Sequence, residues 1–414
     1  MKTYIFFTRR FINIGGSEQY LYNKKNFLER QGWRVLIFSG QHGSILINDF
    51  KRFERYIYTE LYCVPSCFPR KTVEKVINRI VSDIGDCKGE DCVVESVYLP
   101  SCIWAEMVAS RIKARHLAFP LQERHVYDEE AKKYLWFKYN RHELAGIARD
   151  SVRQMLGDDS LELRDDLKIS TFGNNVFDDC DDPYTKLLDE KADYSFASIG
   201  RLVKPCVPAI VEGFCSYARN HPDKRFNVVM IGDSIKKGRK ESIRKKLSRV
   251  SNIHTVMPGD VYPIPRSFAS KIDVFVSTAG AATATYIERY PTVKVNPLNG
   301  DPVGVTGLDY MPKEKNMYAS SPDLSIEKCI DNAIFNRDKI RFVRGNGNEY
   351  ISRMNTEFQR QLSFLDFTDK KDYYDAKLLI QIKQSNTRFP WLHSFLGHIL
   401  GGDGYEKFRK YIGK

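Results

Sequence analysis

The sequence predicts an α/β protein of two domains, each with a parallel β-sheet covered by helices on both faces. Three observations lead to this fold class. The chain has 414 residues, which suits two domains of about 150–200 residues each. Short apolar strands alternate with amphipathic helices along both halves. An acidic stretch at 178–191, which contains Pro183, separates the halves.

The first half predicts an N-terminal domain at 1–180. Its opening apolar run is followed by Gly15 and Gly16 and by a helix that Gly32 ends. Lys24 lies on the apolar side of this helix, from which we expect its long side chain to extend its charge outward. The expected strands are 3–7, 34–39, 92–98, 116–119, 146–148 and 168–172, and the expected helices are 17–30 and 102–113.

The second half restarts the same alternation and predicts a domain at 191–370. A helical tail at 371–414 follows, and packing back on the N-terminal domain is one arrangement open to it. The expected strands are 194–199, 226–231, 253–257 and 272–277, and the expected helices are 209–220 and 237–249.

Composition narrows the class of protein. Hydrophobic residues make up 42% of the chain, which argues against disorder, and no apolar run is long enough for a membrane-spanning helix. The nine cysteines show no paired metal-site spacing, so reduced thiols and a cytoplasmic protein are expected. A net charge of +12 favours an anionic partner. No nucleic-acid-binding signature is present, so nucleic acid is not expected.

Four segments carry a resemblance to a known family. IGGSEQYLYNKKNFLERQGWRVLIFSG and LKISTFGNNVFD lie in the first half, and SIGRLVKPCVPAIVEGFCSYARNHPDKRFNVVMIGDS and NIHTVMPGDVYPIPRSFASKIDVFVST lie in the second. In order and spacing they resemble the large retaining group of GT-B glycosyltransferases. That resemblance implies two Rossmann-like domains facing each other across a cleft. It also implies transfer of a sugar from a nucleotide-activated donor to a hydroxyl acceptor, in cell-surface polysaccharide or glycolipid assembly.

Glycines and cations are the first donor-binding candidates. Gly15 and Gly16 precede a helix, where backbone N–H groups favour an anion, although a plain tight turn would use the same residues. Arg201 and Lys204 follow a strand-ending glycine, and the resemblance implies that they face the donor diphosphate. Fixed cations there assist departure of the nucleoside diphosphate. A surface pair without chemistry is the alternative.

The segment STAGAATATYIERYPTVKVNP supplies the remaining donor candidates. Ala282 and Thr283 suit a loop and helix start that hold a phosphate, with simple packing as the alternative. The resembling family carries two glutamates separated by seven residues here. Glu288 matches the second, which implies a donor-ribose contact. Gly280 stands at the first position, a departure that leaves donor-sugar handling and the stereochemical outcome open.

Glu123 and His125 are the acceptor-side candidates. Either could orient or deprotonate an acceptor hydroxyl, and a charged loop without chemistry is equally compatible with the sequence. No metal is expected, because Arg201, Lys204 and helix ends could neutralise the diphosphate. No permanently bound cofactor is expected either, since the nucleotide sugar is a substrate.

Two segments suggest a membrane surface as a partner, and hence a peripheral location at the inner face of the membrane. EEAKKYLWFKYNRHEL (129–144) mixes aromatic and basic residues, and FPWLHSFLGHILGG near the C-terminus is apolar. A lipid-linked acceptor would explain both, while packing of the rings in the core would explain the first. A second function class is also open, namely a non-catalytic sugar-nucleotide-binding or scaffold protein, for which Gly280 is the main support.

Overall fold

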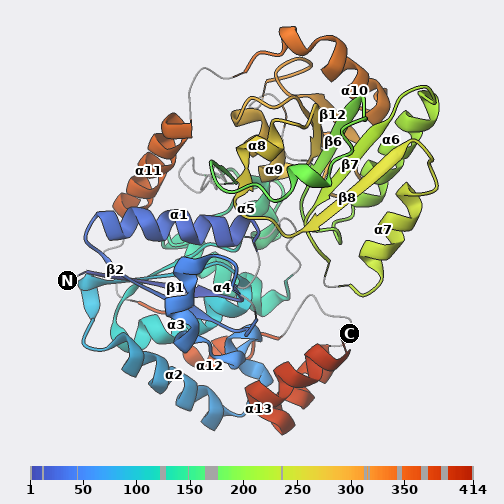
Figure 1. Ribbon diagram of the computed structural model, residues 1–414. Coiled ribbons are helices and arrows are strands. Elements are labelled where there is room, and N and C mark those ends of the chain that lie inside the picture. Colours follow the sequence, from blue (N-terminus) through green and yellow to red (C-terminus); the bar gives the residue numbers. More distant parts are fainter. Residues whose placement is uncertain are drawn as a thin grey trace. The chain divides into compact units, whose positions relative to one another are not determined.

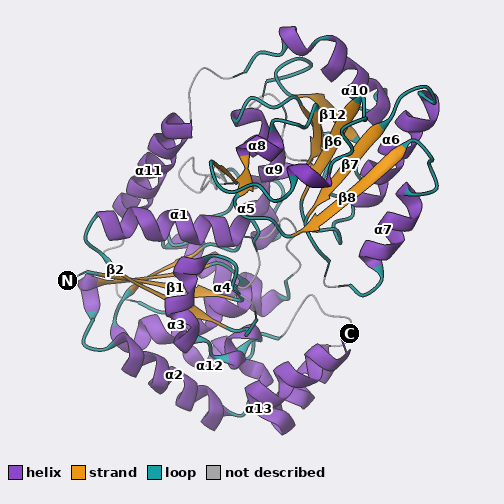
Figure 2. Ribbon diagram, in the orientation of Figure 1, coloured by secondary structure: helices purple, strands orange, loops and turns teal. Residues whose placement is uncertain are grey.

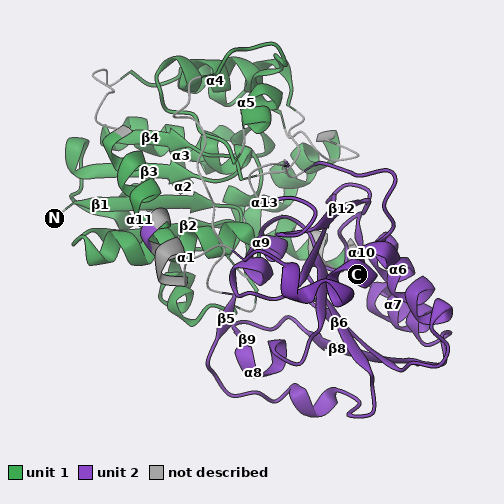
Figure 3. Ribbon diagram, turned by 90° about the horizontal axis from the view of Figure 1, so that it is seen from above, with its two compact units in different colours: residues 1–171, 353–412 green, residues 172–352, 413–414 purple. Residues whose placement is uncertain are grey.

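A computed structural model of the chain (Figure 1) describes residues 2–11, 14–43, 45–121, 127–147, 149–163, 176–234, 236–311, 315, 318–342, 347–364, 372–383 and 390–412. The chain forms two compact units, drawn in green and purple in Figure 3. Unit 1 contains Met1–Thr171 and Arg353–Ile412, and unit 2 contains Phe172–Ser352 and Gly413–Lys414. The return to unit 1 thus comes at Arg353, earlier than the residue 371 at which the sequence predicts the tail.

Unit 1 consists of a parallel sheet and its helices (Figure 2). Its strands are β1 (Thr3–Thr8), β2 (Arg34–Ser39), β3 (Cys92–Ser96) and β4 (Arg115–Ala118). Its α-helices are α1 (Gly16–Arg30), α2 (Arg70–Ile84), α3 (Leu99–Ile112), α4 (Glu129–Asn140), α5 (Arg149–Leu156), α12 (Ala376–Leu379) and α13 (Pro390–Ile412). Helix α11 (Gly347–Phe364) enters it from unit 2, and the 3₁₀ helices are η1 (Asn48–Tyr56), η2 (Thr59–Tyr62), η3 (Pro65–Cys67) and η4 (Gly89–Asp91).

The unit 1 sheet has the strand order β2-β1-β3-β4, and every pairing is parallel. All six residues of β1 are buried, which explains their uninterrupted apolar run. The prediction that Lys24 extends its charge outward is wrong. Its side chain is fully buried, and its Nζ lies 2.5 Å from Oε2 of Glu95 on β3. The Tyr4 and Tyr20 hydroxyls also donate to Glu95, so the buried carboxylate has three donors.

Unit 2 has a six-stranded sheet of order β12-β11-β10-β6-β7-β8 and a two-stranded pair, β5-β9. The strands are β5 (Phe177–Asp178), β6 (Tyr194–Ile199), β7 (Phe226–Ile231), β8 (Ile253–Gly259), β9 (Ile264–Pro265), β10 (Val274–Ser277), β11 (Thr292–Val295) and β12 (Pro302–Val305). The α-helices that lie wholly in it are α6 (Val207–Asn220), α7 (Arg239–Leu247), α8 (Arg266–Ala269), α9 (Ala279–Ile287) and α10 (Ile326–Phe335), and η6 (Thr185–Leu187) and η7 (Arg337–Lys339) are 3₁₀ helices.

Both faces of the larger sheet are buried. Phe196 on β6 belongs to one apolar cluster, with Phe214 of α6, and its neighbour Ala197 belongs to a second cluster with Phe268 of α8. Because adjacent strand residues point to opposite faces, these two clusters are the cores on either side of the sheet. Four of the five strand pairings are parallel, and β12 is the antiparallel edge strand. This is the α/β architecture that the sequence predicts.

Most sequence-predicted elements lie where expected. The strands at 34–39, 194–199 and 226–231 match to the residue, and the predicted helix at 209–220 corresponds to α6, which starts two residues earlier. Of the strand predicted at 146–148, Gly146 is an isolated bridge position, like Leu144, which bridges to Ala118, and residue 148 lies outside the described residues. The strand predicted at 168–172 lies outside the described residues.

Helix α4 contains most of the segment of the first membrane hypothesis. Tyr134 and Leu135 are fully buried, and Lys138 is buried with its Nζ 2.9 Å from Glu106 and 2.5 Å from Glu143. Lys132 pairs with Glu129 within the same helix. These three buried side chains serve the core of unit 1, whereas Trp136, Phe137 and Tyr139 are half-buried and Lys133 is exposed.

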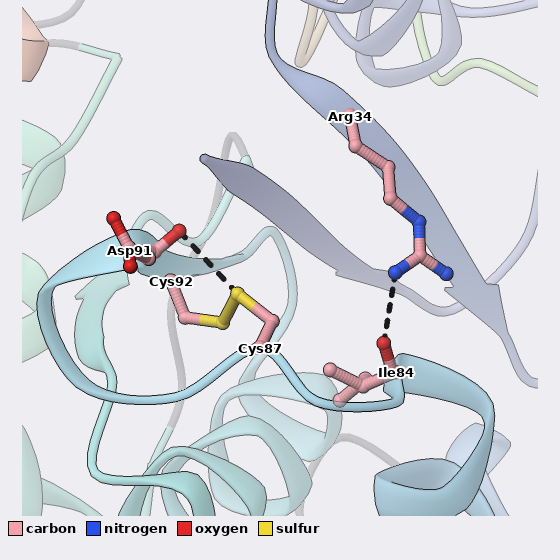
Figure 4. The surroundings of a disulfide bond; sticks show 5 residues. All are labelled: Arg34, Ile84, Cys87, Asp91 and Cys92. Atoms are coloured by element: carbon pink, nitrogen blue, oxygen red, sulfur yellow. Dashed lines mark hydrogen bonds between the residues drawn. A yellow bond between two sulfur atoms is a disulfide. The ribbon is translucent and has the colours of Figure 1, made fainter. Parts of the chain in front are cut away.

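The prediction that all cysteines are reduced is wrong for one pair. Cys87 and Cys92 form a disulfide across five residues, with their Cα atoms 6.0 Å apart (Figure 4). Cys92 is the first residue of β3, and the backbone oxygen of Asp91 just before it lies 3.4 Å from the Cys87 sulfur. Seven cysteines remain free.

Candidate functional site

The larger sheet of unit 2 changes winding direction between β6 and β10. From β6 the chain continues through α6 to β7 and then β8 on one side, and it crosses to β10 on the other side. Ligands of such sheets bind beyond the carboxyl ends of the strands at this switch point. The residues that follow β6 and β10 are therefore the first candidates for a ligand-binding site. The two strand ends are joined directly, because the Ile199 N–H donates to the Ser277 hydroxyl at 3.1 Å.

Glycines end three adjacent strands at this edge. Gly200, Gly232 and Gly259 lie at the ends of β6, β7 and β8, with φ values of 146°, 135° and 89°. Gly200 N–H donates to Ile231, and Gly232 N–H donates to Gly259. A Cβ on Gly232 would lie 2.2 Å from the Gly200 oxygen. The edge thus depends on glycine, and it presents backbone where side chains would stand.

Two cations lie on the loop after β6. Arg201 is exposed and Lys204 half-buried, and neither makes an ion pair or side-chain hydrogen bond within the described part of the chain. Half-buried Arg239 at the start of α7 donates from Nε to the Leu202 oxygen at 3.1 Å, and Leu202 N–H donates to the Asp233 oxygen. The loop is therefore fixed from behind while its two cations stay available to an anion.

Helix α9 begins beside this loop without a side-chain cap. Its N-cap residue, Thr278, makes no capping bond, and its buried hydroxyl has no partner among the described residues. Ala279 has a φ of 49°, unusual for a residue with a Cβ. Ala282 in the first turn is buried, Thr283 is half-buried, and Gly280 is exposed, with no atom within 4 Å of where a Cβ would stand. Uncapped N–H groups at a helix start favour an anion.

Glu288 lies at the other end of α9. It is the C-cap residue, and its carboxylate accepts two hydrogen bonds from Arg266, at 2.9 Å from Nε and 3.3 Å from Nη2. Arg266 also pairs with Asp179 at 3.2 Å. The nine residues of α9 separate Glu288 from the helix start by roughly 13 Å. The structure thus brings Arg201, Lys204, Ala282 and Thr283 to one edge and places Glu288 in a separate charged cluster.

In unit 1 the corresponding switch point lies between β1 and β3, and α1 begins there. Gly15 is the N-cap of α1, and a Cβ on it would lie 2.9 Å from Oε2 of Glu18. Gly16 has nothing within 4 Å of that position. The Glu18 side chain is buried in the first turn and accepts from the Ser17 hydroxyl. A carboxylate of the chain itself therefore already lies at this helix start.

A buried relay of polar groups lies behind the same edge. Ser96, the last residue of β3, lies 2.8 Å from Nε2 of His116, whose Nδ1 lies 2.6 Å from Glu106. Although burial opposes it, Lys138 and His116 hold the pKa of Glu106 at about 2. Burial and Lys138 lower the pKa of His116. The order serine, histidine, carboxylate matches that of hydrolases, but all three are shielded from solvent, so we interpret the relay as support for the sheet.

No family model matches the chain, and no curated protein matches it in sequence. Solved structures do match. Anabaena HepE in complex with UDP-glucose superposes with a TM-score of 0.58 at 11% identity, over 88% of this chain and 100% of HepE. A mutant of S. aureus TarM, in complex with fondaparinux, α-GlcNAc-glycerol and UDP, gives a TM-score of 0.52 at 11% identity, over 88% and 100%.

The chain has the GT-B fold. At 11% identity the match establishes the arrangement of elements and transfers no activity. Units 1 and 2 are thus the two halves of a GT-B protein.

Within the GT-B frame, sequence reasoning missed several residues that shape the edges. Arg239 lies outside the quoted segments, and Thr278 and Glu18 lie inside them without a predicted role, because only the tertiary structure shows what they do at the loop after β6, the start of α9 and the start of α1. Asp260 is a further one, because burial and neighbouring Asp233 raise its pKa at the end of β8. A raised carboxyl pKa near a strand end is a common property of functional groups.

The acceptor-side candidates of this GT-B chain, Glu123 and His125, lie outside the described residues. Across the ranges that the structure does describe, no cluster of three histidine, cysteine or acidic side chains is arranged to bind a metal ion. Among the described helices, none combines the length and the apolar composition needed to cross a bilayer.

Proposed function

We propose that this GT-B protein is a glycosyltransferase that moves a sugar from a nucleoside-diphosphate sugar to a hydroxyl acceptor. One observation carries the proposal. At the switch point of unit 2, two cations without partners among the described residues and an uncapped helix start meet beside glycine-ended strands. A diphosphate has the charge and the size to engage both, and its negative charge grows as it leaves the sugar.

Uridine is the base we propose for the donor. The HepE and TarM structures contain UDP, and HepE also binds UDP-glucose. Arg201, Lys204 and the α9 N-terminus supply positive charge at the diphosphate, so we propose transfer without a metal. Retention of anomeric configuration follows the resemblance. Product anomers assigned by NMR test the stereochemistry, and full activity in excess EDTA tests metal independence.

The first experiment measures UDP binding and donor turnover for Arg201→Ala. We expect transfer to become slower, with the activation free energy raised by about 2–4 kcal/mol, because the cation acts mainly on the leaving group. The matched control is Arg249→Ala, an exposed arginine that precedes β8 and so belongs to the opposite edge of the sheet. Equal kinetics for the two variants would contradict the proposed site.

A non-catalytic sugar-nucleotide-binding or scaffold protein is the second candidate, and Gly280 favours it. The resembling family has a glutamate near the donor sugar at this position. Gly280 has open space around a Cβ and no positive φ, so Gly280→Glu is compatible with the fold. Tight UDP binding without turnover in wild type, with turnover appearing in Gly280→Glu, would select the second candidate.

The acceptor belongs to unit 1 in this proposal. The glycine pair at the start of α1 lies beside the β1–β3 switch point, and Glu123 and His125 remain the proposed catalytic groups. A glycan or lipid-linked hydroxyl compound is the proposed acceptor, in cell-surface polysaccharide or glycolipid assembly at the cytoplasmic face of a membrane.

A further inference from the structure

Helix α13 carries apolar side chains on its solvent side. Trp391, Phe395 and Ile399 follow one another at four-residue spacing and are 67%, 55% and 63% exposed, and Leu400 beside them is 41% exposed. Residues four apart in a helix lie on the same face. The three large side chains therefore form one stripe, which we call the α13 stripe.

Close contacts fix α13 on unit 1 on both sides of its break at Gly401. Before the break, a Cβ on Gly397 would lie 2.3 Å from the Cys67 oxygen. After it, a Cβ on Gly402 would lie 2.5 Å from the Thr59 hydroxyl, which donates to Asp403 at 2.9 Å. At Gly397 there is therefore no room for a larger side chain.

A helix on the surface of a globular protein normally buries its apolar face. In α13 Gly397 packs against unit 1, while the α13 stripe faces outward. Three large apolar side chains, each more than half exposed in one patch, exceed the scattered exposure that needs no explanation. The α13 stripe therefore has the character of a binding surface.

The charge near the α13 stripe indicates which kind of surface it binds. After the break at Gly401, the last turns of α13 contain exposed Lys407, and Tyr411 is 80% exposed. The whole chain carries +12. Apolar residues, aromatic rings and an exposed cation on a basic chain together match an anionic bilayer surface.

We propose that α13 is an interfacial helix that docks this protein on an anionic membrane surface, with Trp391, Phe395 and Ile399 inserted at the headgroup level. The inference does not depend on the glycosyltransferase proposal, and its test measures binding instead of transfer.

The test is flotation of the full chain with vesicles of equal parts phosphatidylglycerol and phosphatidylcholine at low salt. Wild type is expected to float, and the triple variant Trp391→Ser, Phe395→Ser, Ile399→Ser to lose at least about tenfold in partitioning. Phe335→Ser is the matched control, because Phe335 on α10 is 75% exposed outside the stripe. Trp391→Phe should still float but lose the blue shift of tryptophan emission on vesicle binding.

Three outcomes would overturn the proposal. Wild type stays with the unbound protein, or the triple variant floats as well as wild type. In the third, the triple variant changes only the oligomeric state or the melting temperature of the chain, which would assign the stripe to a second copy or to this chain's own packing.

Discussion

Replacing Lys24 by methionine tests the buried charge cluster of unit 1. Lys24 and Glu95 are both fully shielded from solvent, and their Nζ and Oε2 atoms lie 2.5 Å apart. Methionine keeps most of the apolar volume and removes the charge, which leaves the Glu95 carboxylate buried with only the Tyr4 and Tyr20 hydroxyls. Breaking a buried pair in this way costs about 3–5 kcal/mol of unfolding free energy.

Tryptophan fluorescence is the assay, because it reports unit 1 alone. All four tryptophans belong to unit 1, namely Trp33, Trp104, Trp136 and Trp391. With a urea m-value of about 3 kcal/mol per M, the expected loss lowers the midpoint by about 1–1.7 M. Arg111→Met is the control, because Arg111 pairs with Glu74 on the surface and its loss should leave the midpoint unchanged.

The double variant Lys24→Met, Glu95→Gln separates charge from packing. It removes both charges and keeps an acceptor for the tyrosines, so it should be more stable than Lys24→Met alone. The reasoning is refuted if Lys24→Met unfolds at the midpoint of the Arg111 control, or if the double variant is less stable than the single one.

Three further predictions concern separate parts of the molecule. Gly232→Ala should lower the calorimetric stability of unit 2 by at least about 2 kcal/mol, because its Cβ meets the Gly200 oxygen and its φ is positive, whereas Gly280→Ala should not. Glu288→Ala should raise the donor Michaelis constant, and unchanged UDP affinity by titration calorimetry would restrict Glu288 to its pairing with Arg266. Cys67 donates to the Cys63 sulfur, and this hydrogen bond lowers the pKa of Cys63 to about 5. The Cys63 thiolate should therefore contribute its full share of the unfolding free energy above about pH 8.5, the pKa of an unfolded cysteine, and lose it as the pH falls through about 5. Ultraviolet thiolate absorbance of wild type against Cys63→Ser, followed across that range, should show the same midpoint.

Elements set by local pattern could be predicted from the sequence. The strand at 194–199 and helix α6 follow from short apolar runs, helical periodicity and a glycine at the strand end, all within a few residues. Lys24 shows the limit. Its partners, Glu95 and Gln361, lie 71 and 337 residues away, so the sequence indicates a snorkelling lysine where the fold has a buried ion pair.

The candidate site divides in the same way. Arg201, Lys204 and the start of α9 were predictable because each follows the end of a predicted strand, and parallel strands end at one edge. Arg239 and Thr278 could not be predicted. Arg239 reaches the loop from a different helix. Thr278 matters because it is an N-cap residue that makes no capping bond, which only the structure shows. The Cys87–Cys92 disulfide was missed because spacing alone does not reveal how the chain turns into β3.

The placement of unit 2 inside the sequence of unit 1 has a consequence for synthesis on the ribosome. Residues 353–412 complete unit 1, yet they are translated only after residues 172–352 of unit 2. At about 5–20 residues per second, the N-terminal part waits roughly 10–40 s for them. During that interval Lys24 lacks Gln361, and the surface around Thr59 and Cys67 lacks α13. A nascent chain whose unit 1 surface stays uncovered for this long is a substrate for chaperones. A premature stop after residue 352 would leave Phe172–Ser352 of unit 2 beside an unfinished unit 1.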